Sequence, residues 1–73
     1  MNPHAVRQTL LEAPGFLKEI RLNDGSRVTI RNREQWLAGP DFLDVLVGRM
    51  IHHIAYRNIA AIRILPRRAR ASK

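Results

Sequence analysis

Apolar and polar residues alternate with a period of two on both sides of Asn23-Asp24-Gly25. This period is typical of a β-strand with one buried face, because successive side chains point to opposite sides. Gly25 supplies a positive φ, so the triplet predicts a tight turn between strands near residues 16–23 and 27–32. The expected apolar face holds Phe16, Ile20, Leu22, Val28 and Ile30 with the stem of Lys18, and the opposite face holds Leu17, Glu19, Arg21, Arg27, Thr29 and Arg31.

The segment before this hairpin follows a helical period instead. Asn2 caps free backbone amides well, and Pro3 is tolerated at the first helical position. One stripe is formed by Val6, Leu10 and Ala13, widened by Leu11, while Arg7, Gln8 and Glu12 face elsewhere. Ala13-Pro14-Gly15 should end the helix, because a residue that precedes proline disfavours the α region. We predict a short amphipathic helix from Asn2 to Glu12 that lies on an apolar surface.

Three further strands are expected near residues 43–48, 50–56 and 59–65, with Gly48-Arg49 as the turn between the first two. A rival interpretation makes Phe42 to Ile54 one helix. The apolar residues of that segment do not line up along one face of a helix. Its β-branched residues and the central Gly48 favour strands.

The link between the two hairpins has a weaker pattern. Asn32 is expected to cap a single turn that runs from Arg33 to Trp36, closed by Ala38-Gly39-Pro40. Trp36 would then plug one end of a small barrel.

Size and composition narrow the class of protein. With 73 residues there is room for one domain with a small core, expected over residues 1–66. Cysteine is absent, so disulfides are excluded and self-association is the favoured source of extra stability. The longest uncharged run is far short of a membrane span and no leader pattern opens the chain, which favours a soluble, cytoplasmic protein.

The charge is strongly basic. The net charge is +7, and eleven of the thirteen cations are arginine. Four of those cations lie in residues 67–73, where no apolar period survives, so we expect a basic, disordered tail. Arginine binds phosphate with two parallel hydrogen bonds and stacks on bases, which makes nucleic acid the leading partner. A tail that only improves solubility is the alternative.

Signals for catalysis or for a bound metal are missing from the sequence. His52 and His53 are adjacent, so on a strand they point to opposite faces and cannot chelate one ion. The four glycines are isolated turn residues rather than a phosphate loop, and no nucleophile stands in an elbow motif. We expect no enzyme activity, no cofactor and no metal.

Tyr56-Arg57-Asn58 is the most distinctive polar group, since it interrupts two apolar runs at a tight connection. Tyrosine or arginine stacks against a base face, and asparagine hydrogen-bonds a base edge. The three residues therefore indicate either a nucleotide pocket or a polar β-turn with a tyrosine at the barrel edge.

The order of these elements resembles the Sm-like family, and within it the bacterial Hfq RNA chaperones. The segment EIRLNDGSRVTI, from Glu19 to Ile30, resembles the first Sm motif, and Asp41-Phe42-Leu43 resembles the acidic-x-aromatic corner that follows it. AYRNIAAI, from Ala55 to Ile62, resembles the second motif, in which a short basic and polar connection between the last two strands faces the ring pore.

The resemblance implies a mainly β fold, namely a five-stranded, bent antiparallel barrel of the Sm-like (SH3-like) type with an N-terminal α-helix. It also implies a cyclic homo-oligomer that binds single-stranded RNA without catalysis, joined by pairing of the strand at residues 51–56 with the strand at 44–47 or its neighbour on the next subunit. The candidate RNA-binding residues are Tyr56, Arg57, Asn58, Phe42, Arg7 and Gln8, together with the tail residues Arg67, Arg68 and Arg70. A small barrel that serves as a protein-interaction or assembly module is the alternative.

Overall fold

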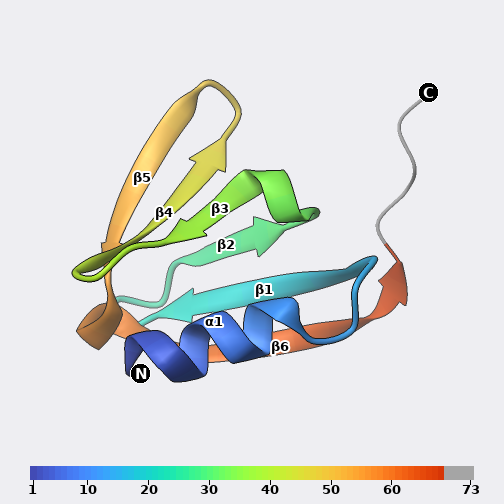
Figure 1. The fold of residues 1–73 in the computed structure, drawn as a ribbon, viewed down its shortest axis with the longest axis horizontal. Helices are drawn as coiled ribbons and strands as arrows, with labels where there is room; N and C mark the ends of the chain where they lie inside the picture. The colour runs from blue at the N-terminus through green and yellow to red at the C-terminus, as the bar shows by residue number, and fades with distance from the viewer. Residues whose placement is uncertain (69–73) are drawn as a thin grey trace.

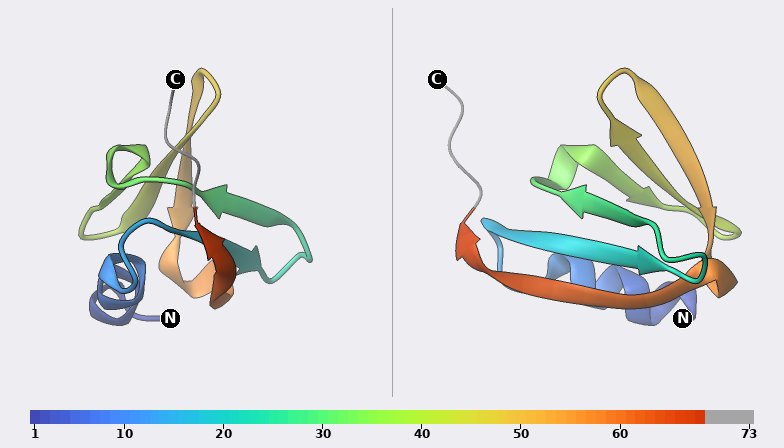
Figure 2. Two further views of the ribbon diagram at one scale, coloured as in Figure 1. Left: turned by 90° about the vertical axis from the view of Figure 1, so that its right-hand side faces the viewer. Right: turned by 180° about the vertical axis from the view of Figure 1, so that it is seen from behind.

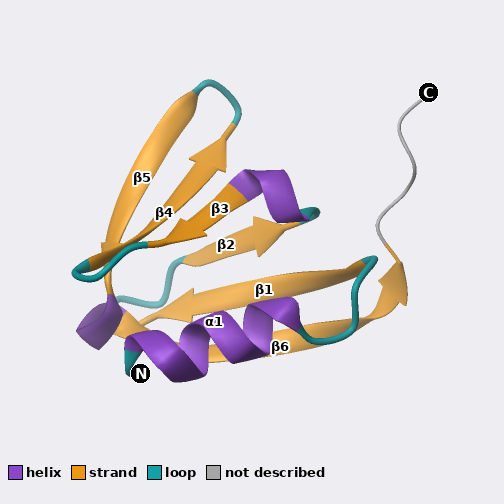
Figure 3. Cartoon of the chain, viewed as in Figure 1, coloured by secondary structure: helices purple, strands orange, loops and turns teal. Residues whose placement is uncertain are grey.

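One helix and six strands make up residues 1–68, which are the part of the chain that the computed structural model describes (Figures 1 and 3). The elements are α1 (Pro3–Leu11), β1 (Phe16–Leu22), β2 (Arg27–Ile30), β3 (Trp36–Ala38), β4 (Phe42–Val47), β5 (Met50–Ala55) and β6 (Ile59–Arg68), with single 3-10 turns η1 (Arg33–Gln35) and η2 (Tyr56–Asn58). The predicted mainly β class with an N-terminal helix is confirmed.

The strands form two three-stranded antiparallel sheets rather than a closed barrel (Figure 2). One sheet has the order β2-β1-β6 and the other the order β3-β4-β5. The sequence predicted five strands. The sixth strand is β3, over residues 36–38, where the sequence predicted the end of a single turn and the start of the residues that close it. Within residues 1–68 no ladder joins the two sheets.

Both predicted hairpins are confirmed. In the first, Glu19 lies opposite Thr29 and Gly25 adopts a φ of 91°. In the second, Val45 lies opposite His52 and Gly48 adopts a φ of 62° at the turn. The rival helix over residues 42–54 is therefore wrong, because this segment forms two paired strands.

A side chain explains why β2 ends at Ile30 and pairs only with β1. The carboxamide of Gln35 donates from Nε2 to the Thr29 carbonyl at 2.9 Å and accepts from the Arg31 amide at 2.7 Å. These two backbone groups point to the same edge of β2, since they belong to residues two apart. Gln35 thus occupies the hydrogen-bonding positions that a neighbouring strand would use, and the chain leaves through η1 before β3 begins.

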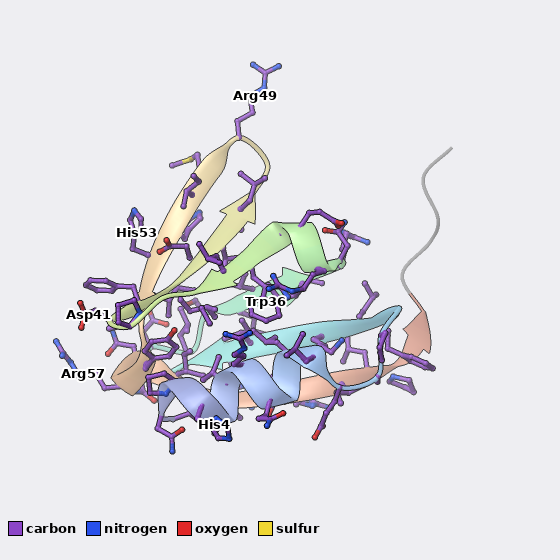
Figure 4. All side chains as sticks on the ribbon, in the orientation of Figure 1. His4, Trp36, Asp41, Arg49, His53 and Arg57 are labelled. Carbon is purple, nitrogen blue, oxygen red and sulfur yellow. The ribbon has the colours of Figure 1, made fainter. Side chains whose placement is uncertain are left out.

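The core lies between the two sheets and under α1. Trp36 is 4 % exposed there, and its position between the elements is visible in Figure 4. The remaining buried members of this cluster are Val6, Leu10, Ile20, Ile30, Leu43, Val45, Ile54, Tyr56 and Ile59. Trp36 is therefore a central core residue, and it begins a strand instead of ending a helical turn.

The predicted helix is shorter at its C-terminus than the Pro14 signal suggested. The Asn2 side chain accepts a hydrogen bond from the Ala5 amide at 2.7 Å, which confirms the predicted cap. Leu11 is the last helical residue and Glu12 is already extended. Ala13 then takes a φ of 47°, outside the right-handed helical region. Leu11 is 44 % exposed, so it does not widen the buried stripe.

Lys18 occupies an apolar position on β1, as its place in the alternation predicted. Its side chain is buried, and Nζ donates to the carbonyls of Ala13 at 3.2 Å and Phe16 at 3.4 Å. Burial lowers the pKa of Lys18, while the carboxylate of Glu12 acts in the opposite direction. Two carbonyl acceptors thus satisfy an ammonium group at the end of the core.

The last strand is longer than the expected 59–65. β6 continues through Pro66 to Arg68, whose backbone lies opposite Phe16. The first two residues of the expected tail therefore belong to a strand. The remainder of that tail, including Arg70, lies outside the described residues.

Candidate nucleic-acid interface

Tyr56 is a core residue. Its side chain is 6 % exposed, and its hydroxyl donates to the Gly39 carbonyl at 2.6 Å. The N-terminal amine of Met1 donates to the Tyr56 carbonyl at 3.1 Å. The aromatic ring therefore joins η2 to the end of β3, and it does not present a face on which a base could stack.

Burial raises the pKa of Tyr56 above its ordinary value of 10.0, and the carboxylates of Asp44 and Asp41 raise it further. The unfolded chain therefore releases this proton at lower pH than the folded chain. The contribution of the neutral hydroxyl to stability is complete below about pH 10 and is lost as the pH rises through the folded pKa.

We expect Tyr56→Phe to lower the free energy of unfolding at neutral pH by about 1 kcal/mol, because the Gly39 carbonyl loses its donor. The variant should also lose the alkaline decrease that Tyr56 causes in the wild type. Urea unfolding of both proteins at about pH 8 and about pH 11 measures the two effects. If the two proteins differ in free energy of unfolding by the same amount at both pH values, the raised pKa of Tyr56 is contradicted. Lys18 is present in both proteins, so its own titration does not affect this comparison.

Arg57 and Asn58 are exposed, and their backbone is held by the turn of the first hairpin. The Asn23 side chain donates from Nδ2 to the Arg57 carbonyl at 2.9 Å, and the Asn23 amide donates to the Asn58 carbonyl at 2.8 Å. Both side chains remain at the surface, with Arg57 at one end of the molecule (Figure 4). The two residues thus stand on a fixed backbone with their polar groups toward solvent.

Phe42 is at the same end. It pairs with Ala55, directly before η2, and its side chain is 47 % exposed. Its ring meets the imidazole of His53 edge to face, with centroids 6.3 Å apart. The Nδ1 atom of His53 lies 2.6 Å from Oδ1 of Asp44. The structure therefore brings the exposed candidates Phe42, Arg57 and Asn58 to one end, which also carries carboxylates.

The other predicted contacts lie on different elements. Arg7 and Gln8 are exposed on α1. Arg67 and Arg68 belong to β6 by their backbone. The sequence candidates therefore do not form one site.

A basic surface that the sequence reasoning did not single out lies on the outer side of the β2-β1-β6 sheet. Arg21 on β1 pairs directly with Arg27 on β2, and Glu19 pairs with Arg63 on β6. Residues in register share a face, so these four side chains lie together on the side opposite the buried Ile20. We call Arg21, Arg27 and Arg63 with Glu19 the arginine face.

The arginine face has an excess of positive charge. Glu19 is its one carboxylate, with Oε2 3.6 Å from Nη1 of Arg27 and Oε1 3.8 Å from Nη1 of Arg63. Oε1 is buried and makes no hydrogen bond in the described part of the chain. Arg21 has no ion-pair partner among residues 1–68. Like charges directly opposite each other destabilise a sheet, so the Arg21–Arg27 pair costs stability unless an anion joins it.

The signal for this face was present in the sequence, because Glu19, Arg21, Arg27 and Thr29 were assigned to the same side of the first hairpin. The missing information was the register of β6. That register adds Arg63 from the last strand and completes the cluster.

The fold and its surface define a small two-sheet β protein with an N-terminal helix and an arginine-rich outer face. Comparisons with protein-family models, with curated proteins and with solved structures find no match for this chain. In the described part of the chain, no helix has the length and apolar character needed to cross a membrane. The same residues contain no cluster of three or more side chains suited to hold a metal ion.

Proposed function

We propose that this protein binds single-stranded RNA without catalysis and that the arginine face is the main contact surface for phosphates. The observation that carries the proposal is the Arg21–Arg27 cross-strand pair, with Arg63 on the next strand and one carboxylate between them. A phosphate between two guanidinium groups relieves their repulsion and accepts forked hydrogen bonds from either.

The exposed end of the molecule supports a single strand as the form that is bound. Phe42 offers a partly exposed ring, and Arg57 offers a guanidinium plane on a fixed turn. Unpaired bases stack on such groups, whereas the bases of a duplex are not accessible to them. Asn58 would hydrogen-bond a base edge there. The tail arginines, Arg67, Arg68 and Arg70, would add contacts that do not depend on sequence.

We also propose an Sm-like assembly of several copies into a ring. The order of elements supports it: a helix first, and a 3-10 turn before a last strand that pairs with the first. β4 is hydrogen-bonded to β3 on one edge and to β5 on the other within the same chain. It therefore has no free edge with which β5 of a neighbouring copy could pair. The outer edges of β5 and β6 have no strand partner in residues 1–68, which makes a β5–β6 contact between copies the favoured arrangement.

Titration of the wild type with labelled oligo-uridine and oligo-adenosine at about 50 and 200 mM salt tests the RNA-binding proposal. The three arginines of the arginine face should contribute about −2 to the slope of log affinity against log salt, at roughly 0.7 per phosphate for a single strand, and the tail arginines should make it steeper. The absence of binding at the lower salt concentration would overturn the proposal. Arg49→Gln is the matched control, because Arg49 is at the tip of the β4–β5 hairpin and points away from the sheets (Figure 4).

An assembly module without a nucleic-acid role is the second candidate. Met50 and Ile51 are 66 % and 62 % exposed on β5, and Leu37 on β3 is 61 % exposed. Apolar side chains along an unpaired strand edge are typical of an interface. A mass in solution that increases with protein concentration, together with no affinity for either oligonucleotide, would favour this candidate.

A further inference from the structure

A groove runs between the outer edge of β2 and the β4–β5 hairpin. Its volume is about 740 Å³, within the range of roughly 300–1,000 Å³ that is usual for sites of small ligands. Arg27, Arg31 and Asn32 line one side, and Leu46, Val47 and His52 line the other. We call it the β2 groove.

The groove exists because the hairpin is longer than the strand that it faces. Val45 is fully buried, and His52 lies opposite it on β5, so both belong to the side of the sheet that faces the core. Val47 continues this side, but it is 41 % exposed because β2 ends at Ile30 and Gln35 occupies its edge. The inner side of the hairpin therefore continues beyond the core as an uncovered apolar wall.

The chemistry of the two walls is complementary to a nucleotide. Val47 provides an apolar surface for a base, while Asn32 and His52 provide groups that hydrogen-bond a base edge. Arg27 and Arg31 supply guanidinium groups for a phosphate, and Glu34 is the one carboxylate in the lining. Arg31 has no ion-pair partner in the described part of the chain.

We propose that the β2 groove binds one nucleotide of an RNA strand that continues across the arginine face. Arg27 belongs to both surfaces, so a phosphate that it holds on the face leads directly into the groove. This inference rests on the proposed RNA-binding function and adds to it a position where one base is buried. The base lies against Val47, and its 5′-phosphate contacts Arg31.

The direct test is titration of the wild type with adenosine 5′-monophosphate, followed through the NMR signals of the His52 side chain and of the Val47 methyl groups. Ribose 5-phosphate and inorganic phosphate are the comparison ligands, because they carry the phosphate without the base. We expect the nucleotide to shift both sets of signals and to bind at least about fivefold more tightly than ribose 5-phosphate, since stacking adds to phosphate contact. Equal affinity for all three ligands would overturn the inference.

A pair of variants separates the groove from the face. Val47→Gln places an amide on the apolar wall, while Leu11→Gln makes a similar change on α1, at a residue of comparable exposure that does not line the groove. We expect Val47→Gln to weaken nucleotide and oligonucleotide binding about fivefold, with binding by Leu11→Gln unchanged and both variants folded by circular dichroism. If Val47→Gln binds oligonucleotides as the wild type does, the groove proposal fails and the RNA-binding proposal stands. If the wild type binds the mononucleotide but no oligonucleotide, the RNA-binding proposal fails and the groove remains a nucleotide site.

Discussion

Trp36→Ala should remove a large part of the free energy that keeps the protein folded. Removal of a buried aromatic side chain typically costs about 3–5 kcal/mol, as the lost transfer free energy adds to the cavity left behind. A domain of this length has a total stability of about 4–11 kcal/mol, at roughly 0.05–0.15 kcal/mol per residue. Trp36 is 4 % exposed in the cluster that joins α1 to both sheets, so one substitution removes a large part of the core.

The contacts around Trp36 add to this effect. The guanidinium carbon of Arg33 lies 4.1 Å from the centroid of the indole ring, and Nη1 of Arg33 donates to the Trp36 carbonyl at 2.9 Å. Trp36 also pairs with Val45, which fixes the start of β3 on the second sheet. Loss of the indole therefore removes the stacking partner of η1 as well as core volume.

Urea unfolding followed by circular dichroism measures the loss of stability. Tryptophan fluorescence cannot be used, because the variant lacks the one tryptophan. Leu37→Ala is the control, because Leu37 is the next residue on β3 and is 61 % exposed. Its cost should stay within about 0.5 kcal/mol, as for most surface substitutions. A Trp36→Ala protein with the unfolding midpoint of the Leu37→Ala protein would contradict the core assignment.

The parts of the fold that follow from local chemistry were predictable. The hairpin at Gly25 needs only a positive φ and a period of two, and both lie within fifteen residues of sequence. Asn2 caps α1 through an amide three residues away. The position of Lys18 also followed from the alternation alone.

The open architecture was not predictable in the same way. It depends on the carboxamide of Gln35, which reaches back to the edge of β2 and takes the place of a strand. A polar residue in a short turn gives no sign of such a contact in the sequence. The same holds for β3, which is three residues long and exists because Trp36 is buried against β4.

Tyr56 shows why the candidate site was only partly predictable. Tyr56-Arg57-Asn58 has the composition of a nucleotide-binding turn, but the ring turns inward, where the carbonyl of Gly39, seventeen residues earlier, gives its hydroxyl a partly buried acceptor. Arg57 and Asn58 keep the exposure that the pattern indicated. The arginine face required the pairing of three strands, which composition does not encode.

Substitution of both Arg21 and Arg27 by glutamine should have opposite effects on stability and on RNA binding. Arg21→Gln removes a like-charge pair and should raise the free energy of unfolding by about 0.2–1 kcal/mol. Once that repulsion is gone, adding Arg27→Gln to the same protein should change the free energy of unfolding little. The second substitution also removes the exposed ion pair between Arg27 and Glu19, 3.6 Å apart. If the two arginines served only to stabilise the sheet, replacing them would not raise the free energy of unfolding.

RNA binding should decrease in the same proteins. Each lost phosphate contact lowers the slope of log affinity against log salt by about 0.7 for a single strand, so the double variant should have a slope smaller by about 1.4 than the wild type. The loss should be similar for oligo-uridine and oligo-adenosine, because phosphate contacts carry no base preference. Arg57→Ala should instead weaken binding by about 1–3 kcal/mol with a change in preference between the two, as expected for a stacked or forked base contact.

Fluorescence anisotropy at two salt concentrations and urea unfolding, carried out on the wild type, the two single variants, the double variant and Arg49→Gln, measure both effects together. If the double variant keeps the wild-type slope while Arg57→Ala abolishes binding, the end of the molecule around Phe42 and Arg57 is the principal site and the arginine face is not. If the double variant binds weakly but is also less stable than the wild type, the Arg21–Arg27 pair supports the sheet, and the loss of affinity follows from partial unfolding. Higher stability with lower affinity is the combination expected of a binding surface, because an anion that joins the two arginines offsets a repulsion that the free protein carries.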